Sequence, residues 1–276
     1  MLDDIKTKFL EHLKSQNKAS ATILAYGKDI EQLIAVLKGL NKANFAEVAK
    51  ADLDLFLKKL KDDGFTPKTI SRKINSLKTF YRFLKNTGLV AVNPAAELTH
   101  PKYELKVPRI LSKMEYRALR DVCRSDTRTY AIIELFLQTG LRISEVADLK
   151  SEDLQNSKLI VGKREIPLNS SVNKAVSDYL SVRPKKETNH LFITKTGKPL
   201  LVRNIRTVID RVLKIAGVES AKVNDLRATF IAYQLSSGVP LDYVSKLVGH
   251  KRLSTTERYL KLITEKAKKG AKLVEL

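Results

Sequence analysis

Four short stretches of this chain contain basic or nucleophilic side chains close to the predicted end of a helix or the tip of a hairpin. LQTGLRISEVADLK holds Arg142, and LIVGKREIPL holds Lys163 at the tip of a tight hairpin. NDLRATF and LVGHKRLSTTERYLKL hold the remaining candidates, namely Asn224, Arg227, His250 and Tyr259. Planar guanidinium groups donate paired hydrogen bonds to phosphate oxygens, and a phenol can act as a nucleophile. Brought together, such residues would suit attack on a phosphodiester.

Each stretch also has an ordinary structural explanation. Arg142, expected in the first turn of a helix, and Glu145 are three residues apart, the spacing of an ion pair within one helix. Asn224 or Asp225 is a typical N-cap residue. Tyr259 has helical spacing to the apolar residues that follow it, as a core tyrosine would. A lysine at a hairpin tip is usually solvated.

Several other chemistries are not indicated by the sequence. It contains no GxxxxGK[ST] phosphate loop, no HExxH and no GxSxG motif. Its four histidines and single cysteine do not cluster, and its carboxylates are scattered rather than paired at metal-binding spacing. We therefore predict neither a metal nor a cofactor.

The net charge indicates the class of partner. The chain has 276 residues, and 51 Lys and Arg against 30 Asp and Glu give a formal net charge of +21. Such an excess attracts polyanions. DNA or RNA is favoured over an anionic membrane, because no helix has the pattern of a basic amphipathic anchor. A lysine-rich surface that only keeps the protein soluble is the plain alternative.

The sequence predicts a cytoplasmic protein. No apolar run approaches the length of a membrane span, and the N-terminal MLDDIKTKFLEHLK has acids where a signal peptide has bases before an apolar core. Cys123 has no partner for a disulfide and is expected to be a small buried hydrophobe.

Four helices are predicted in the first 92 residues, approximately at 2–15, 20–38, 51–63 and 67–86. The last contains no acidic residue. Its apolar face comprises Ile70, Ile74, Leu77, Tyr81 and Leu84. The opposite face is basic and would repel itself unless a polyanion lay against it, so we predict that it binds DNA through Lys68, Arg72, Lys78, Arg82 and Lys85.

A proline-rich segment divides the chain, because helices cannot continue through NPAAELTHPKYELKVPRILS. The predicted domains are 1–92, a linker at 93–111, and 112–276. Ser112 and Glu115 form a capping box for a helix near 112–124, and helices follow to about 149. SKLIVGKREIPLN is typical of a hairpin, Leu159–Val161 returning as Glu165–Leu168, and HLFIT could add a strand. From Val202 onward helices resume, so the predicted fold is mainly α with a small β insertion.

In their order along the chain, TGLRISEVADL, VGK, DLRATF and LVGHKRLSTTERYLKL resemble the sequence blocks of the tyrosine recombinases, the phage-integrase family. Xer-like members, archaeal ones included, are the most similar. The resemblance covers nearly the whole chain and implies a tyrosine recombinase fold: a helical DNA-gripping domain, then a catalytic domain. In such a site Arg142 and Arg227 would hold phosphate oxygens, and Glu145 would orient Arg142.

The resemblance also assigns the covalent chemistry. Tyr259 would become linked to a 3′-phosphate, Lys163 would protonate the leaving 5′-oxygen, and His250 would donate a hydrogen bond to a phosphate oxygen. Because the phosphotyrosyl ester conserves the bond energy, rejoining needs neither ATP nor metal.

Two positions depart from the family pattern. Asn224 and Ala228 stand where most relatives have histidine, and Asn224 cannot accept a proton near neutral pH. The hairpin turn is also shorter than usual, which makes Arg164 a competitor of Lys163 as the leaving-group acid, although its high pKa argues against this role. We expect slower cleavage or a different rate-limiting step, with the reaction unchanged.

The resemblance implies a site-specific recombinase that exchanges strands of double-stranded DNA as a homotetramer, through a Holliday junction, with chromosome dimer resolution as the expected role. The state of the free protein, monomer or dimer, and a regulatory protein partner are left open. The segment TEKAKKGAKLVEL either packs into a neighbouring subunit or forms a frayed surface helix. The alternatives are a DNA-binding protein that keeps the fold without cutting and a type IB topoisomerase-like relaxing enzyme.

Overall fold

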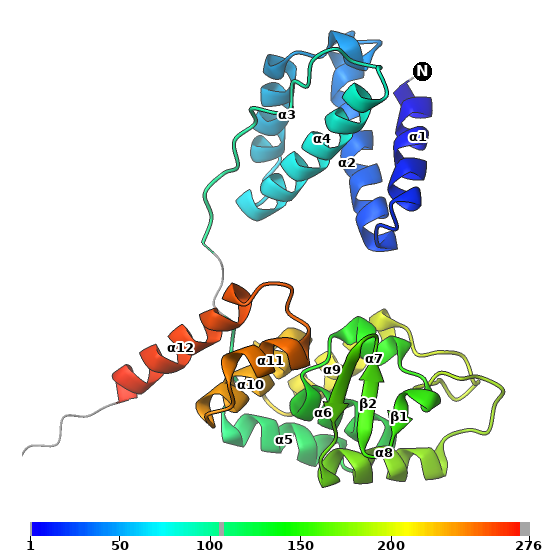
Figure 1. The fold of residues 1–276 in the computed structure, drawn as a ribbon, viewed down its shortest axis with the longest axis vertical. Helices are drawn as coiled ribbons and strands as arrows, with labels where there is room; N and C mark the ends of the chain where they lie inside the picture. Colours follow the sequence, from blue (N-terminus) through cyan, green and yellow to red (C-terminus); the bar gives the residue numbers. More distant parts are fainter. Residues whose placement is uncertain (1, 105–107, 271–276) are drawn as a thin grey trace, which may run out of the picture. The chain divides into compact units, whose positions relative to one another are not determined.

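The computed structural model describes residues 2–104 and 108–270, with side chains as far as Ile263 (Figure 1). The chain forms two compact units, Met1–Leu105 and Lys106–Leu276. This division falls inside the segment 93–111 that the sequence predicts as a linker, and the predicted domain boundaries remain a proposal. The leucine and valine residues of TEKAKKGAKLVEL lie outside the described residues.

The first unit is a four-helix domain, and its four predicted helices are confirmed to within a residue. They are α1 (Leu2–Ser15), α2 (Ser20–Gly39), α3 (Lys50–Asp62) and α4 (Pro67–Asn86), with a short 3-10 turn at Phe45–Glu47. Thr66 caps α4 by accepting a hydrogen bond from Thr69 N, and Pro67 stands in the first turn, where its missing N–H costs nothing. The five predicted apolar residues of α4 are all buried, and they share the core with Phe9, Phe45, Phe56 and Phe80.

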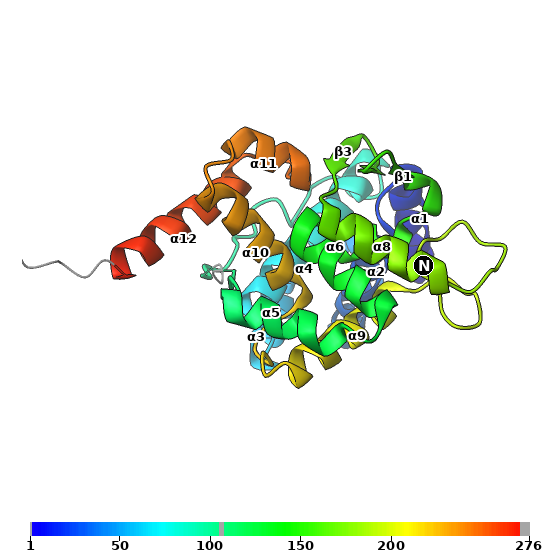
Figure 2. The same ribbon diagram turned by 90° about the horizontal axis from the view of Figure 1, so that it is seen from below.

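The second unit is mostly helical and packs around a central helix. Its helices are α5 (Lys113–Cys123), α6 (Thr127–Thr139), α7 (Ile143–Asp148), α8 (Ser170–Val182), α9 (Val202–Ile215), α10 (Val223–Ser236), α11 (Leu241–Val248) and α12 (Ser254–Gly270). Nine of the thirteen residues of α6 are buried and none is exposed, because α5, α8 and α10 pack around it. In both views α12 runs outward from α10 and α11 (Figures 1 and 2). The capping box of Ser112 and Glu115 and the burial of Cys123 are confirmed.

The β insertion is a three-stranded antiparallel sheet in the order β1-β2-β3. The predicted hairpin is present as β2 (Lys158–Val161) and β3 (Arg164–Pro167), with Val161 paired to Arg164. A third strand, β1 (Leu154–Gln155), is an addition to the predicted elements. HLFIT is not a strand: it forms only isolated bridges at His190 and Ile193. Leu191 and Phe192 are buried in the core of the second unit, and Ile193 is buried as well, which explains the misleading pattern.

Gly140, which ends α6, has a left-handed backbone with φ of 62°. A Cβ atom there would lie 2.4 Å from Cδ1 of Phe230 on α10, so α6 and α10 can approach this closely only with glycine at the helix end. No helix in the described part of the chain is long and apolar enough to cross a membrane.

We expect Gly140→Ala to lower the free energy of unfolding by about 2–4 kcal/mol, because backbone strain adds to the clash with Phe230. Gly217 is a matched control, since it has φ of 71° and a Cβ atom added there would meet no atom within 4 Å. Gly217→Ala should therefore cost only about 1 kcal/mol. Urea unfolding followed by circular dichroism measures both, and equal losses would contradict the close approach as the cause.

Candidate active site

Arg142 stands at the start of α7 and is held by Glu145. It is the N-cap residue of this helix, with an extended backbone, and not a residue of the first turn as predicted. Glu145 accepts a hydrogen bond from Arg142 N at 2.7 Å through one oxygen and from Arg142 Nη1 at 2.8 Å through the other. The expected ion pair is thus present, and it fixes the guanidinium. Arg142 Nη2 also donates to the carbonyl oxygen of Gly249 at 2.5 Å.

Arg227 is buried on α10, with 8% of its surface exposed. Its guanidinium donates to the carbonyl oxygen of Gly140 at 2.5 Å and to that of Val248 at 2.7 Å. Burial, and then the nearby charge of Arg142, lower the pKa of Arg227 to about 10. The side chain stays protonated at neutral pH, and it links the ends of α6 and α11.

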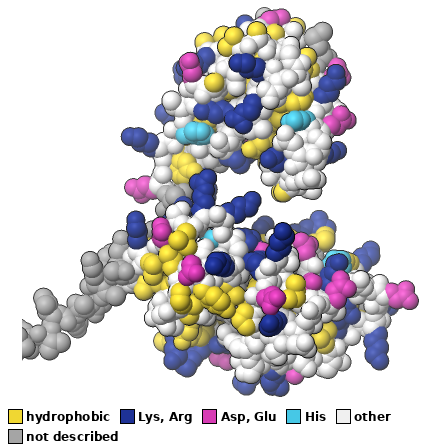
Figure 3. Space-filling view, in the orientation of Figure 1, with side chains coloured by type: hydrophobic (Ala, Val, Ile, Leu, Met, Phe, Trp, Pro, Cys, Tyr) yellow, Lys and Arg dark blue, Asp and Glu magenta, His cyan; other side chains and the backbone are white. Residues whose placement is uncertain are grey.

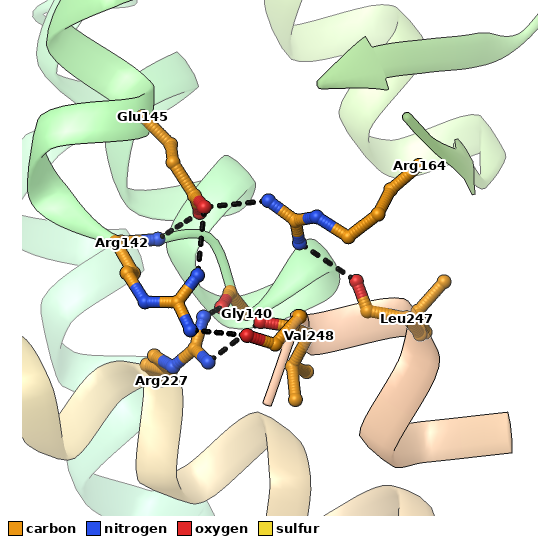
Figure 4. Close-up of polar contacts among 8 residues, drawn as sticks. Gly140, Arg142, Glu145, Arg164, Arg227, Leu247 and Val248 are labelled. Carbon is orange, nitrogen blue, oxygen red and sulfur yellow. Dashed lines mark hydrogen bonds and ion pairs between the residues drawn. The ribbon is translucent and has the colours of Figure 1, made fainter. Parts of the chain in front are cut away.

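Arg164, at the start of β3, completes this arginine cluster (Figure 4). It donates to Glu145 Oε1 at 2.5 Å and to the carbonyl oxygen of Leu247 at 2.9 Å. The three arginines therefore bind three successive carbonyls, those of residues 247, 248 and 249, at the C-terminal end of α11. Carbonyls at a helix C-terminus have no partner within the helix and hold partial negative charge, which favours cations there.

The cluster is suited to binding an anion. Among the side chains drawn in Figure 4, Glu145 has the single carboxylate, which accepts from Arg142 and Arg164, whereas Arg227 donates only to backbone carbonyls. The excess positive charge and the remaining N–H donors of Arg142 and Arg227 suit a phosphate group, to which arginine donates paired hydrogen bonds.

His250 follows the arginine-bound end of α11. Gly249 has a left-handed backbone with φ of 66°, which ends the helix and turns the chain toward α12. His250 Nδ1 shares a hydrogen bond of 2.7 Å with the hydroxyl of Thr256, a fully buried residue of α12. This contact leaves Nε2 of His250 as the ring nitrogen available to a ligand.

Tyr259 lies one helical turn beyond Thr256 on α12. Its ring stacks near that of His250, with centroids 6.3 Å apart and planes at 17°. Together with Ile263 it packs as a partly buried residue against a small apolar cluster that contains Phe230, so the core-tyrosine interpretation describes only part of its surroundings. Burial raises the pKa of Tyr259, whereas the charges of Arg227 and Arg258 act in the opposite direction. The phenol therefore keeps its proton at neutral pH unless a base takes it.

The ionisation of His250 makes a testable contribution to stability. Burial and the charges of Arg227 and Arg142 lower its pKa to about 4, against an ordinary 6.5. Between these values the unfolded chain binds more protons, so this stability is complete above pH 6.5 and is lost as the pH falls toward 4. We expect His250→Gln to remove about 1–2 kcal/mol of the loss between pH 7 and 4.5, allowing for partial exposure. Urea unfolding across this range measures it, and parallel curves for the two proteins would contradict the burial of a neutral imidazole.

Lys163 and Asn224 have no fixed polar partner in the described part of the chain. Lys163 is exposed in the two-residue turn between β2 and β3, as predicted for a hairpin tip. Asn224 is exposed in the first turn of α10, and the expectation that Asn224 or Asp225 is the N-cap is wrong. Lys222 is the N-cap residue, and its backbone N–H donates to Asp225 at 2.8 Å. Asn224 instead lines a surface hollow together with Arg206 and Lys222.

The basic residues predicted on α4 differ in their surroundings. Lys68, Arg82 and Lys85 are exposed and Lys78 is half-buried, whereas the Arg72 guanidinium binds both carboxylate oxygens of Asp29 at 2.5 and 2.9 Å. The neighbouring Lys73, which is not one of the predicted DNA-binding residues, is buried against the same aspartate. Lys and Arg side chains also recur over the visible face of each unit (Figure 3).

Two side-chain contacts of the site were not predicted from the sequence. Arg164 donates to Glu145, and Thr256 shares a hydrogen bond with His250. For Arg164 a signal existed, because it stands two residues before the buried Ile166 and therefore on the same face of β3. No group of three or more His, Cys, Asp or Glu side chains among the described residues has metal-binding geometry.

Comparison with known proteins matches both units to models of the phage integrases. Residues 109–266 match the model of the phage integrase family, and residues 7–88 match that of the phage integrase N-terminal SAM-like domain. The tyrosine recombinase XerC of Listeria welshimeri is 32% identical over 96% of this chain and 95% of its own length. XerC of Bacillus licheniformis is also 32% identical, over 92% of this chain and 90% of its own length.

Solved structures share the fold at lower identity. The crystal structure of XerA recombinase is 23% identical, covers 99% of this chain and 100% of its own, and gives a TM-score of 0.55. A lambda integrase dimer bound to a COC′ core site is 16% identical, covers 99% and 79%, and gives 0.74. The Tn1549 transposon integrase in complex with circular intermediate DNA is 20% identical, covers 92% and 94%, and also gives 0.74.

Proposed function

Because the chain belongs to the phage integrase family and is a Xer-like tyrosine recombinase, we propose that it recombines double-stranded DNA through a covalent 3′-phosphotyrosyl intermediate. The observation that supports this most is the arginine cluster: Arg142 and Arg227 are fixed side by side by the end of α11, and the chain continues from there through His250 to Tyr259. The proposed catalytic residues are Arg142, Lys163, Asn224, Arg227, His250 and Tyr259.

The proposed cleavage step exchanges one phosphate ester for another. Tyr259 Oη attacks the phosphorus, the new O–P bond forms, and the bond to the 5′-oxygen breaks with its electron pair leaving on that oxygen. Lys163 Nζ gives a proton to the leaving oxygen, and the phenolic proton passes to solvent. Arg142 and Arg227 stabilise the added negative charge on the equatorial oxygens, and His250 donates from Nε2. Rejoining reverses these transfers with the 5′-hydroxyl of a second strand, so this mechanism consumes no ATP.

Asn224 is the proposed difference from most relatives. An amide can donate to or accept from a phosphate oxygen, but it cannot take the phenolic proton near pH 7. Burial has raised the pKa of Tyr259, so formation of the phenolate is the step that we expect to be slow in this protein.

The proposed partner is duplex DNA, bound by the basic face of α4 and by the catalytic unit, with a homotetramer acting on two duplexes. Two features support DNA as the partner. They are the net charge of +21 and the similarity in fold to integrases whose structures contain bound DNA. The proposed role is chromosome dimer resolution, as the resemblance to the Xer-like recombinases implies.

Strand exchange tests this proposal. Duplexes that the protein selects from a random pool are placed on a labelled fragment and on a supercoiled plasmid, and the two are incubated together in EDTA without ATP. We expect joint molecules that contain both DNAs. Relaxed plasmid without joint molecules would indicate a topoisomerase-like enzyme, and binding without any strand cleavage would indicate a DNA-binding protein that keeps only the fold.

A further inference from the structure

Arg164 connects the hairpin to the arginine cluster. It opens β3 and pairs with Val161 of β2, so that only Gly162 and Lys163 lie between the paired residues. Its two terminal nitrogens donate to Glu145 at 2.5 Å and to the Leu247 carbonyl at 2.9 Å. The hairpin is therefore tied at its turn both to α7 and to the end of α11.

The turn leaves Lys163 little independent freedom in its backbone. Gly162 has φ of 60°, and Lys163 is not among the described residues with positive φ, which is the pattern of a type II′ turn with glycine at its first central position. The Lys163 side chain is exposed and makes no polar contact within the described part of the chain. The place of its ammonium group thus depends on the residue that follows it.

Arg164 is also packed rigidly. A Cβ atom on Gly249 would lie 3.0 Å from Arg164 Nε and 3.1 Å from its Cζ, so the guanidinium lies against the backbone one residue before His250. The side chains of Arg164 and Glu145 are only 18% and 16% exposed, and this limits screening of the ion pair by solvent. A shorter or unforked side chain would lose one of the two anchors.

We propose that Arg164 is a positioning residue that holds Lys163 where its ammonium can protonate the leaving 5′-oxygen, an inference that rests on the proposed function. Arg164 is not itself the acid, because a guanidinium keeps its proton and both of its terminal nitrogens already donate within the protein. When Arg164 is removed, Arg142 keeps its bonds to Glu145 and to the Gly249 carbonyl, so the phosphate contacts remain.

A sulfur leaving group separates these roles. In a suicide duplex with a 5′-bridging phosphorothiolate at the scissile position, the leaving thiolate has a conjugate-acid pKa of about 8.5 and needs no proton. We expect Arg164→Ala to slow single-turnover cleavage of the oxygen substrate about 10–100-fold and to return to within about threefold of wild type on the sulfur substrate. Lys163→Ala should also be rescued by the sulfur substrate, and its cleavage of the oxygen substrate should be slowed more, about 10²–10⁴-fold. Arg164→Lys, which keeps the charge without the fork, should recover only part of the rate.

Arg183→Ala is the matched control, because Arg183 also donates to backbone carbonyls, those of Thr188, His190 and Leu191, outside this cluster. We expect it to leave the ratio of sulfur to oxygen rates unchanged. If Lys163→Ala is rescued by sulfur and Arg164→Ala is not, Arg164 does not act through Lys163 and the inference is wrong. If the wild-type protein cleaves neither substrate, the proposed function itself fails, and the inference with it.

Discussion

Tyr259→Phe is expected to abolish covalent attachment to DNA while leaving DNA binding within about twofold of wild type. The substitution removes only the hydroxyl oxygen, and the ring keeps its packing near His250 and against the cluster that contains Phe230. Loss of the nucleophile should lower the cleavage rate by at least about 10⁴-fold. Single-turnover cleavage of a nicked suicide duplex, followed on a denaturing gel, measures it.

Tyr243→Phe provides the control for this substitution. Tyr243 lies on α11 in the same unit and is 49% exposed, so it is equally able to lose a hydroxyl without disturbing the core. We expect its cleavage rate to stay within about twofold of wild type. A comparable loss in both variants would show that the hydroxyl of Tyr259 has no special role.

Arg227→Lys is expected to lower the cleavage rate by about 10²–10³-fold. Lysine keeps the positive charge but has no planar fork, so it cannot donate at once to the carbonyls of Gly140 and Val248 and to a phosphate oxygen. The defect should appear in the rate of cleavage at saturating protein more than in the affinity for DNA. A filter-binding titration beside the single-turnover rate separates the two.

Arg211→Lys is a suitable comparison, because Arg211 is exposed on α9 and takes no part in the hydrogen bonds of the arginine cluster. It should cleave like wild type. If Arg227→Lys also cleaved within about threefold of wild type, charge alone would account for the arginine, and the paired geometry of Figure 4 would have no catalytic importance.

The local structure could be predicted because it depends on local pattern. The helix of α4 follows from apolar residues at 3.6-residue spacing between Thr66 and Gly88, and the hairpin follows from a glycine between two short apolar runs. The prediction of a strand at HLFIT was wrong for a related reason. A short apolar run indicates burial, but it does not decide between a strand and a loop that enters a helical core.

The assembly of the site could be predicted only by resemblance. The contacts that hold the arginines join distant residues, 107 positions apart for Arg142 and Gly249 and 87 apart for Arg227 and Gly140. Their acceptors are backbone carbonyls, which every residue has, so no residue type marks them in a sequence. Arg164 was considered as an acid because of its position beside Lys163, whereas its role in binding Glu145 and the end of α11 required coordinates.

The most direct test of the central claim is the polarity and the site of attachment on a suicide duplex built from a selected binding sequence. The strand on the 5′ side of the break should remain linked to protein through its 3′-phosphate, the released fragment should have a free 5′-hydroxyl that a kinase can label, and protease digestion should leave the DNA on the peptide that contains Tyr259. Attachment through a 5′-phosphate, attachment to another residue, or bound DNA without any adduct would contradict the account.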